Sequence, residues 1–76
     1  MNIDLIKEKL NTNGQVRFRL YSLEYLIEKE DDKYLISATL YPNKKTAFPT
    51  VDSLFDNYTI FNENIRDNDQ RIQNII

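Results

Sequence analysis

Carboxylates are the main acid–base groups of this chain, because its 76 residues include no histidine and no cysteine. Two pairs have a spacing that could suit acid–base chemistry: Glu24 with Glu28, and Asp67 with Asp69. A catalytic pair needs one carboxyl group held neutral by burial while its neighbour stays charged. Neither pair lies in a pattern that predicts burial. We interpret both pairs as solvated charges and expect no enzymatic activity.

Metal and phosphate chemistry is also poorly supported by the residue types. Oxygen ligands for calcium are present in residues 62–64 and 67–69. The glycine and the distal glutamate of the EF-hand loop are missing, and turn formation explains these residues equally well. Gly14 is the only glycine and has no partner for a phosphate-binding loop. The serines have no histidine to activate them. We therefore expect neither a metal nor a cofactor.

Basic and aromatic side chains on one predicted strand raise the possibility of nucleic-acid binding. The candidates are Arg17, Arg19, Tyr21, Lys44 and Lys45. Sheets that bind single strands combine basic side chains with exposed aromatic rings. Glu24 and Glu28 lie in the same region and are expected to form cross-strand ion pairs with the arginines. The net charge is −2, so weak binding of single-stranded nucleic acid is the alternative function and not the preferred one.

Large apolar side chains offer a second kind of surface. Five of them are candidate anchors for a partner: Tyr21, Tyr41, Phe61, Ile75 and Ile76. Ordinary core or edge packing would account for the same residues. We expect a small non-catalytic protein-interaction or regulatory module, whose partner is another protein or a second copy in a homodimer. An inhibitor of a host protein, encoded by a phage or mobile element, is one concrete version of this function.

Length and composition set the frame for these surfaces. The chain has 76 residues, 41% of them hydrophobic, which is typical of one folded domain spanning residues 1–76. No apolar run reaches the ~20 residues needed to cross a membrane. Without an export signal, a cytoplasmic location is expected. The abundance of Asn, Ile and Lys indicates an AT-rich source, such as a low-GC bacterium or its phages.

The first elements are a helix and a strand. Asn2 is the expected N-cap of the helix, and residues 11–14 end it, with Gly14 in the left-handed conformation. Residues 15–21 then alternate between apolar and polar side chains. This alternation predicts a strand with one buried face.

A hairpin of residues 23–30 and 33–41 follows, with Asp31 and Asp32 in its turn. A two-residue turn places Ile27 opposite Ile36 and Glu28 opposite Leu35. The Ile27 face is the more apolar one and is expected to cover the core. The opposite face is expected to be mostly solvated.

The last elements are short. Residues 46–48 can form an edge strand that Pro49 ends, and Thr50 can cap a helix that buries Val51, Leu54, Phe55 and Tyr58. Residues 59–61 can form a brief strand. A final helix is expected from Asp67, with Gln70 as its capping-box partner and with Ile72, Ile75 and Ile76 docked on the core. The pattern predicts an α+β fold. A three- to four-stranded antiparallel meander carries the N-terminal helix and one or two C-terminal helices on one face.

Overall fold

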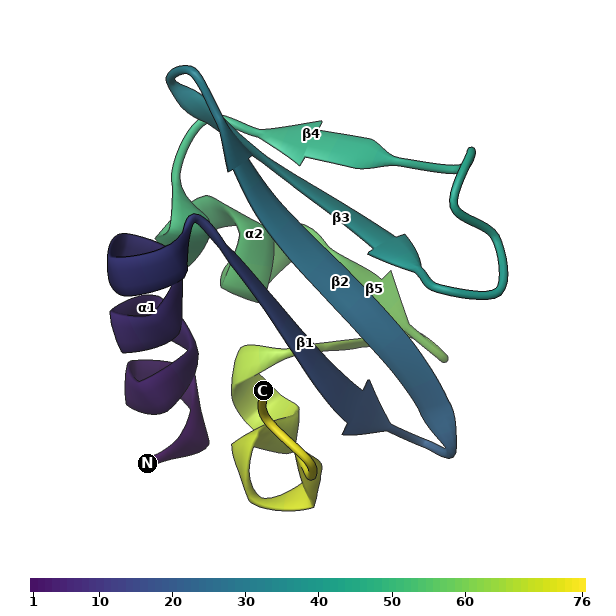
Figure 1. Ribbon diagram of the computed structural model, residues 1–76. Helices are drawn as coiled ribbons and strands as arrows, with labels where there is room; N and C mark the ends of the chain where they lie inside the picture. The colour runs from purple at the N-terminus through teal and green to yellow at the C-terminus, as the bar shows by residue number, and fades with distance from the viewer.

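The computed structural model describes residues 1–76 and has the predicted α+β architecture (Figure 1). The elements in chain order are α1 (Asn2–Asn13), β1 (Gln15–Leu20), β2 (Leu23–Glu30), β3 (Lys33–Ala38), β4 (Thr46–Phe48), α2 (Val51–Asn57), β5 (Thr59–Ile60), β6 (Glu63–Asn64) and the 3₁₀ helix η1 (Arg66–Arg71). Four strands form an antiparallel sheet in the order β1-β2-β3-β4. The helical elements and the β5–β6 hairpin lie on one face of it. None of the helices has the length and apolar character that crossing a membrane requires.

The central hairpin has the predicted register. Ile27 lies opposite Ile36 and Glu28 opposite Leu35. Ile27 and Ile36 are fully buried, so the choice of core face is confirmed. Two details differ from the prediction. Strand β3 ends at Ala38, before the predicted end at residue 41, and Ser37 is buried although it belongs to the outer face.

The core forms where α1 and α2 pack against the inner face of the sheet. A cluster of 14 buried apolar residues joins these elements: Ile3, Ile6, Leu10, Val16, Phe18, Leu20, Tyr25, Ile27, Ile36, Leu54, Phe55, Ile60, Ile65 and Ile72. Strand β1 alternates strictly between exposed and buried residues, as its sequence predicts. The core occupies only one side of the sheet, and no residue of this cluster lies on the outer face.

The two ends of α1 are fixed by different means. Gly14 follows the helix with φ 76°, which confirms the predicted left-handed stop. The prediction that Asn2 is the N-cap is wrong, because Asn2 is the first helical residue and its amide donates to the Asp69 carbonyl at 2.7 Å. The Asp69 carboxylate accepts a hydrogen bond from the Ile3 amide at 2.7 Å. A residue from η1 therefore performs the capping role that we assigned to a local side chain.

Helix α2 follows the predicted pattern closely. The Thr50 hydroxyl accepts a hydrogen bond from the Ser53 amide at 3.0 Å and caps the helix. Leu54 and Phe55 are fully buried, whereas Val51 and Tyr58 are only half-buried at the edge of the core. The predicted contact of this helix with the sheet is confirmed.

The predicted C-terminal helix is wrong in its start, its cap and its end. Residues 66–71 form a 3₁₀ helix. The Asn64 side chain accepts a hydrogen bond from the Asp67 amide, so Gln70 has no capping role. Beyond Arg71 the chain is not helical. Ile72 is buried and Ile75 packs against the core, as expected of docked residues, but Ile76 is 62% exposed.

The segment after η1 instead pairs with the free edge of β1. The Arg19 and Gln73 backbones exchange hydrogen bonds of 2.7 and 2.9 Å, and the Arg17 and Ile76 backbones exchange bonds of 3.0 and 2.9 Å. The C-terminal segment has one residue more than β1 between these pairs, and Asn74 has φ 53°. This extra residue is a β-bulge. The segment covers the β1 edge, which would otherwise expose unpaired backbone groups.

Candidate functional site

Three connections between strands gather at one end of the molecule, which we call the turn end (Figure 1). They are the β1–β2 turn (Tyr21 and Ser22), the β3–β4 loop (residues 39–45) and the β5–β6 turn (Phe61 and Asn62). The meander itself brings the first two together, because β1 and β3 both end there. The third reaches the same end through a contact between Tyr21 and Phe61, whose ring centroids are 5.4 Å apart.

Tyr21 and Phe61 share an unusual backbone conformation. Their φ angles are 55° and 53°, and the residues that follow them, Ser22 and Asn62, also have positive φ. The left-handed region costs a residue with a side chain roughly 1–2 kcal/mol, and two-residue hairpin turns usually place Asn, Asp or Gly there. Phe61 is also 74% exposed, so its ring recovers little of this cost by packing.

The hydroxyl of Tyr21 lies in a polar cluster on the core side of the sheet. It is 2.7 Å from the Glu63 carboxylate and 2.7 Å from the Asn68 side-chain oxygen, and it accepts from Arg71 at 3.2 Å. Tyr21 belongs to a turn and not to strand β1. The prediction that it projects beside Arg17 and Arg19 from one strand face is therefore wrong.

The β3–β4 loop presents two more apolar side chains. Leu40 is 69% exposed and Tyr41 is 57% exposed. The Lys44 ammonium lies 5.6 Å from the centre of the Tyr41 ring. Tyr41 and Phe61 are the predicted anchors that the structure leaves exposed at this end. Leu40 was missed, because it fell inside the strand predicted for residues 33–41.

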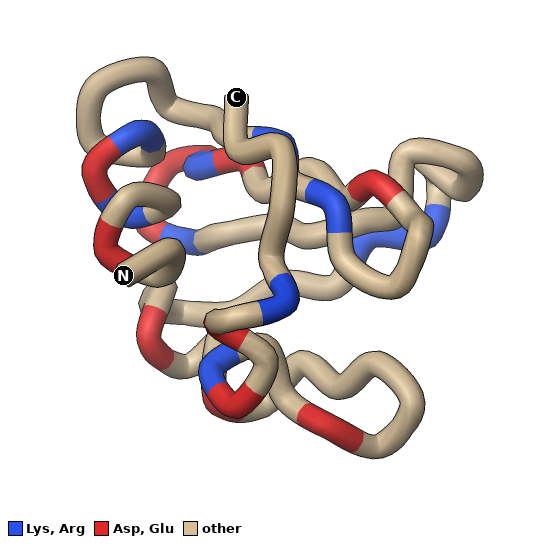
Figure 2. Tube along the Cα trace, turned by 90° about the horizontal axis from the view of Figure 1, so that it is seen from below, with Lys and Arg blue, Asp and Glu red and all other residues tan.

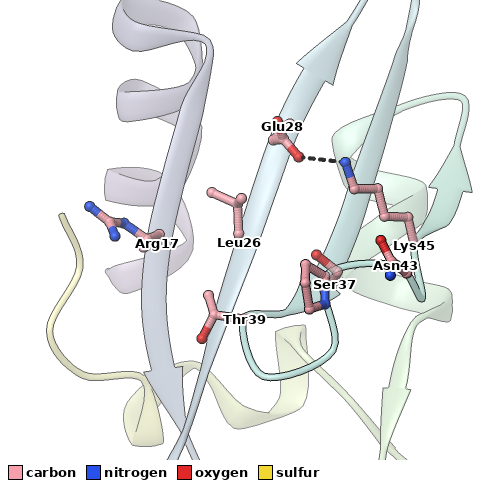
Figure 3. A pocket seen from close by; sticks show the side chains of 8 residues that line it. Arg17, Leu26, Glu28, Ser37, Thr39, Asn43 and Lys45 are labelled. Carbon is pink, nitrogen blue, oxygen red and sulfur yellow. Dashed lines mark ion pairs between the residues drawn. The ribbon is translucent and has the colours of Figure 1, made fainter.

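The β3–β4 loop also forms one wall of a cavity of about 670 Å³ on the outer face of the sheet (Figure 3). We call this cavity the outer-face groove. Its lining residues are Arg17, Leu26, Glu28, Ser37, Thr39, Pro42, Asn43 and Lys45. In Figure 3, Arg17 extends from β1 on one side of Leu26, and the loop residues lie on the other side. Arg17 and Lys45, both predicted from sequence, thus belong to one site.

The charges in this groove are not paired as we predicted. Glu28 of β2 pairs with Lys45 of the β3–β4 loop at 3.3 Å. Neither Arg17 nor Arg19 forms an ion pair with Glu24, Glu28 or any other carboxylate. Arg19 instead donates to the Ser22 carbonyl at 3.2 Å. The predicted neutralisation of the arginines by the β2 glutamates is wrong. Arg17 lines one edge of the groove, and its guanidinium has no carboxylate partner and points away from Leu26 (Figure 3).

A second charged group ties together the elements on the core side. The Asp52 carboxylate of α2 forms ion pairs with Lys7 of α1 at 2.7 Å and with Arg66 of η1 at 3.0 Å. Arg66 also pairs with Asp56. Bonds from Lys7 and then from Arg66 hold the pKa of Asp52 below its usual 3.8. Asp56 and then Asp52 raise the pKa of Arg66. Seen from below, Lys and Arg positions alternate with Asp and Glu positions along the chain (Figure 2).

The lowered pKa of Asp52 predicts a pH dependence of stability. A carboxyl group with a lower pKa in the folded state stabilises the fold above its unfolded pKa, and this contribution disappears as pH falls through the folded pKa. We expect Asp52→Asn to be less stable than the parent protein at neutral pH. The two urea-unfolding curves should converge below pH 3.8. A difference that does not shrink as pH falls from 7 to below 3.8 would contradict this assignment.

The carboxylate pairs considered for catalysis have other roles. Glu28 pairs with Lys45, and Asp69 caps α1. The interpretation of both pairs as solvated charges is wrong for Asp69, which is buried where it accepts the hydrogen bond from the Ile3 amide. No group of three or more acidic side chains is placed to hold a metal ion. Elsewhere in the core, burial raises the pKa values of the Tyr25 and Tyr58 hydroxyls, and the charge of Tyr58 adds to the effect on Tyr25.

The predicted site residues therefore separate into three places. Tyr41 and Lys44 lie on the loop at the turn end, next to the Tyr21–Phe61 pair. Arg17 and Lys45 line the outer-face groove. Ile75 and Ile76 belong to the segment paired with β1, where Ile75 packs against the core. In comparisons with known proteins, no protein-family model matches this chain, and no curated protein or solved structure shows significant similarity to it.

Proposed function

We propose that this protein is a non-catalytic interaction module that binds another protein through the turn end. The observation that carries the proposal is the exposure of Leu40, Tyr41 and Phe61 at the same end of the fold. Binding hot spots are rich in aromatic side chains that fill pockets of the partner. The turn end offers two such rings and one branched aliphatic side chain.

The backbone of Phe61 supports the same reading. Strained positions persist where the surrounding structure holds them, and they concentrate at sites of function. The left-handed conformation of Phe61 raises the free energy of the isolated molecule, and the exposed ring makes few packing contacts that would offset it. A partner that buries the ring would supply the missing contact. We place this activity in the cytoplasm, and inhibition of a host protein is the concrete form that we favour.

Single-stranded nucleic acid is a second candidate, favoured by one specific observation. Arg17 and Arg19 project from the outer face without a carboxylate partner, so both can reach phosphates. Glu24, Glu28 and Glu30 on the neighbouring strand still oppose a phosphate backbone. The net charge of −2 adds to this opposition. The protein partner remains the better supported candidate.

The proposal predicts that Phe61→Asn removes binding without unfolding the protein. Asparagine tolerates the left-handed conformation, so relief of strain offsets the lost contact with Tyr21, and stability should stay within about 1 kcal/mol of the parent. Immobilised protein is exposed to a lysate of the source organism, and captured proteins are quantified by mass spectrometry. Capture should fall at least about tenfold for Phe61→Asn and for Tyr41→Ser.

Ile76→Ser is the matched control, because Ile76 is exposed but its backbone pairs with Arg17 in the middle of β1, away from the turn end. It should capture the same partner as the parent protein. Equal capture by all variants would contradict the assignment of the turn end. A shift of the parent protein to a dimer in sedimentation, lost in Phe61→Asn, would identify the partner as a second copy.

A further inference from the structure

We infer that the outer-face groove binds an extended peptide segment that carries a carboxylate side chain. This inference rests on the proposed function, because it names the chemistry of the protein partner. The groove and the turn end share the β3–β4 loop, whose residues 40 and 41 are exposed while Pro42, Asn43 and Lys45 line the groove. A single segment of a partner can therefore contact both surfaces.

Ser37 gives the first indication of a ligand. The residue is only 3% exposed, but no buried side-chain polar atom of the protein lacks a partner, so the Ser37 hydroxyl, which bonds to no other group of the protein, is open to the solvent of the groove. It lies in the groove between Leu26 and the loop (Figure 3). A solvent-accessible hydroxyl can both donate and accept a hydrogen bond. A peptide group of a bound segment can take the place of water at this hydroxyl.

The charges of the groove give the second indication. Lys45 and Glu28 neutralise each other at 3.3 Å, whereas Arg17 has no carboxylate partner. The lining therefore carries one uncompensated positive charge, which is the guanidinium of Arg17. A guanidinium matches the two oxygens of a carboxylate with parallel hydrogen bonds. An aspartate or glutamate side chain of the partner is the group that fits Arg17.

The shape of the groove favours a polymer over a small molecule. Pockets for small ligands bury most of the ligand surface and are lined mainly by apolar side chains. Here the groove lies open on a sheet face, and Leu26 is the only aliphatic hydrophobic among eight lining residues. An extended peptide uses such a surface well, since its side chains point alternately toward and away from it.

Nucleic acid fits the groove less well than an acidic peptide. No aromatic residue lines the groove, so bases find no ring to stack on. The exposed ring on the same loop, Tyr41, has the Lys44 ammonium over its face. Glu28 lines the groove and repels the repeated phosphates of a nucleic-acid backbone. A single carboxylate at Arg17 is repelled less, because Lys45 pairs with Glu28 and neutralises its charge.

The experiment begins with selection of random ten-residue peptides displayed on phage against the immobilised full chain. Selected peptides are synthesised, labelled, and titrated with each variant by fluorescence anisotropy. Two pairs of variants separate the groove from its surroundings. Arg17→Ala is compared with Arg19→Ala, and Lys45→Ala with Lys44→Ala. In each pair the second residue lies beside the groove without lining it.

The selected peptides should be enriched in Asp and Glu. Arg17→Ala and Lys45→Ala should weaken binding about tenfold, while Arg19→Ala and Lys44→Ala change it less than about twofold. Ser37→Ala should weaken it about three- to tenfold through the lost hydrogen bond. Glu28→Gln should strengthen binding about two- to fivefold, because it removes the negative charge beside Lys45.

Other results would overturn the inference in distinguishable ways. Peptides that lose binding with Phe61→Asn but not with Arg17→Ala would place the partner at the turn end alone, so the proposed function would survive without the groove. Salt-sensitive binding of oligothymidylate, weakened equally by Arg17→Ala and Arg19→Ala, would identify nucleic acid as the ligand. Failure to select any peptide would reject the groove as a peptide site, and the lysate capture would then decide the proposed function separately.

Discussion

Removal of residues 72–76 should lower the melting temperature of this protein by at least about 12 °C. Burial of Ile72 alone contributes roughly 1.5–3 kcal/mol, and Ile75 adds part of its side chain to the core. The truncation also removes four backbone hydrogen bonds to β1 and the acceptor for Asn2 at the Ile72 carbonyl. A total loss of about 3–5 kcal/mol is a large part of the stability of a domain this small.

The truncated protein should also associate. Without its last segment, β1 becomes an exposed edge strand whose Arg17 and Arg19 backbone groups are free to pair with another chain. Thermal unfolding followed by circular dichroism measures the first effect, and sedimentation velocity measures the second. Ile76→Ser is the control, because that side chain is mostly exposed and its backbone bonds remain. An unchanged melting temperature after truncation would show that the segment contributes nothing to the fold.

The error about this segment shows where local patterns stop being informative. Three isoleucines at positions 72, 75 and 76 have a spacing that a helix can place on one face. The segment is extended because β1 offers it a ladder of hydrogen bonds and because Asn74 accepts the positive φ of a bulge. The pairing joins residues more than fifty positions apart. A pattern within five residues carries no information about that partner.

The same reasoning explains the start of α1. A local rule selected Asn2 as the cap, since asparagine is a frequent N-cap residue. The capping carboxylate comes from Asp69, and the Asn2 amide serves to hold the same segment. The central hairpin was predictable because every determinant is local. Asp31 accepts the turn conformation, and the alternation on both flanks fixes the register.

The candidate site was predictable only in part, for similar reasons. The apolar character of Tyr41 and Phe61 is visible in the sequence, and their positions near turns favour exposure. The pairing of charges is not visible in the sequence, because it depends on the loop that places Lys45 against Glu28. Arg19 then turns to the Ser22 carbonyl of its own hairpin. The groove itself depends on how the loop folds over the outer face, which no periodicity encodes.

Replacing Ile36 by alanine should destabilise the protein by roughly 2–5 kcal/mol. Ile36 is fully buried at the centre of the sheet, where Ile27 lies directly opposite on β2 and Thr46 on β4. The deletion of its side chain leaves a cavity that the surrounding strands can only partly fill, because β2 and β3 are each paired with a strand on both sides. Urea unfolding followed by tyrosine fluorescence measures the change, and the midpoint should fall with little change in slope.

Leu35→Ala is the matched control that tests which face of the sheet covers the core. Leu35 precedes Ile36 on the same strand, pairs with Glu28 and Ala47, and is half-buried on the outer face. Its truncation removes a similar volume but leaves the new space open to solvent, so the expected loss is below about 1.5 kcal/mol. If Leu35→Ala were as damaging as Ile36→Ala, the outer face would have to be covered in solution. A second copy of the chain seated on the outer-face groove would then be the first explanation to test, by sedimentation of the parent protein over a range of concentrations.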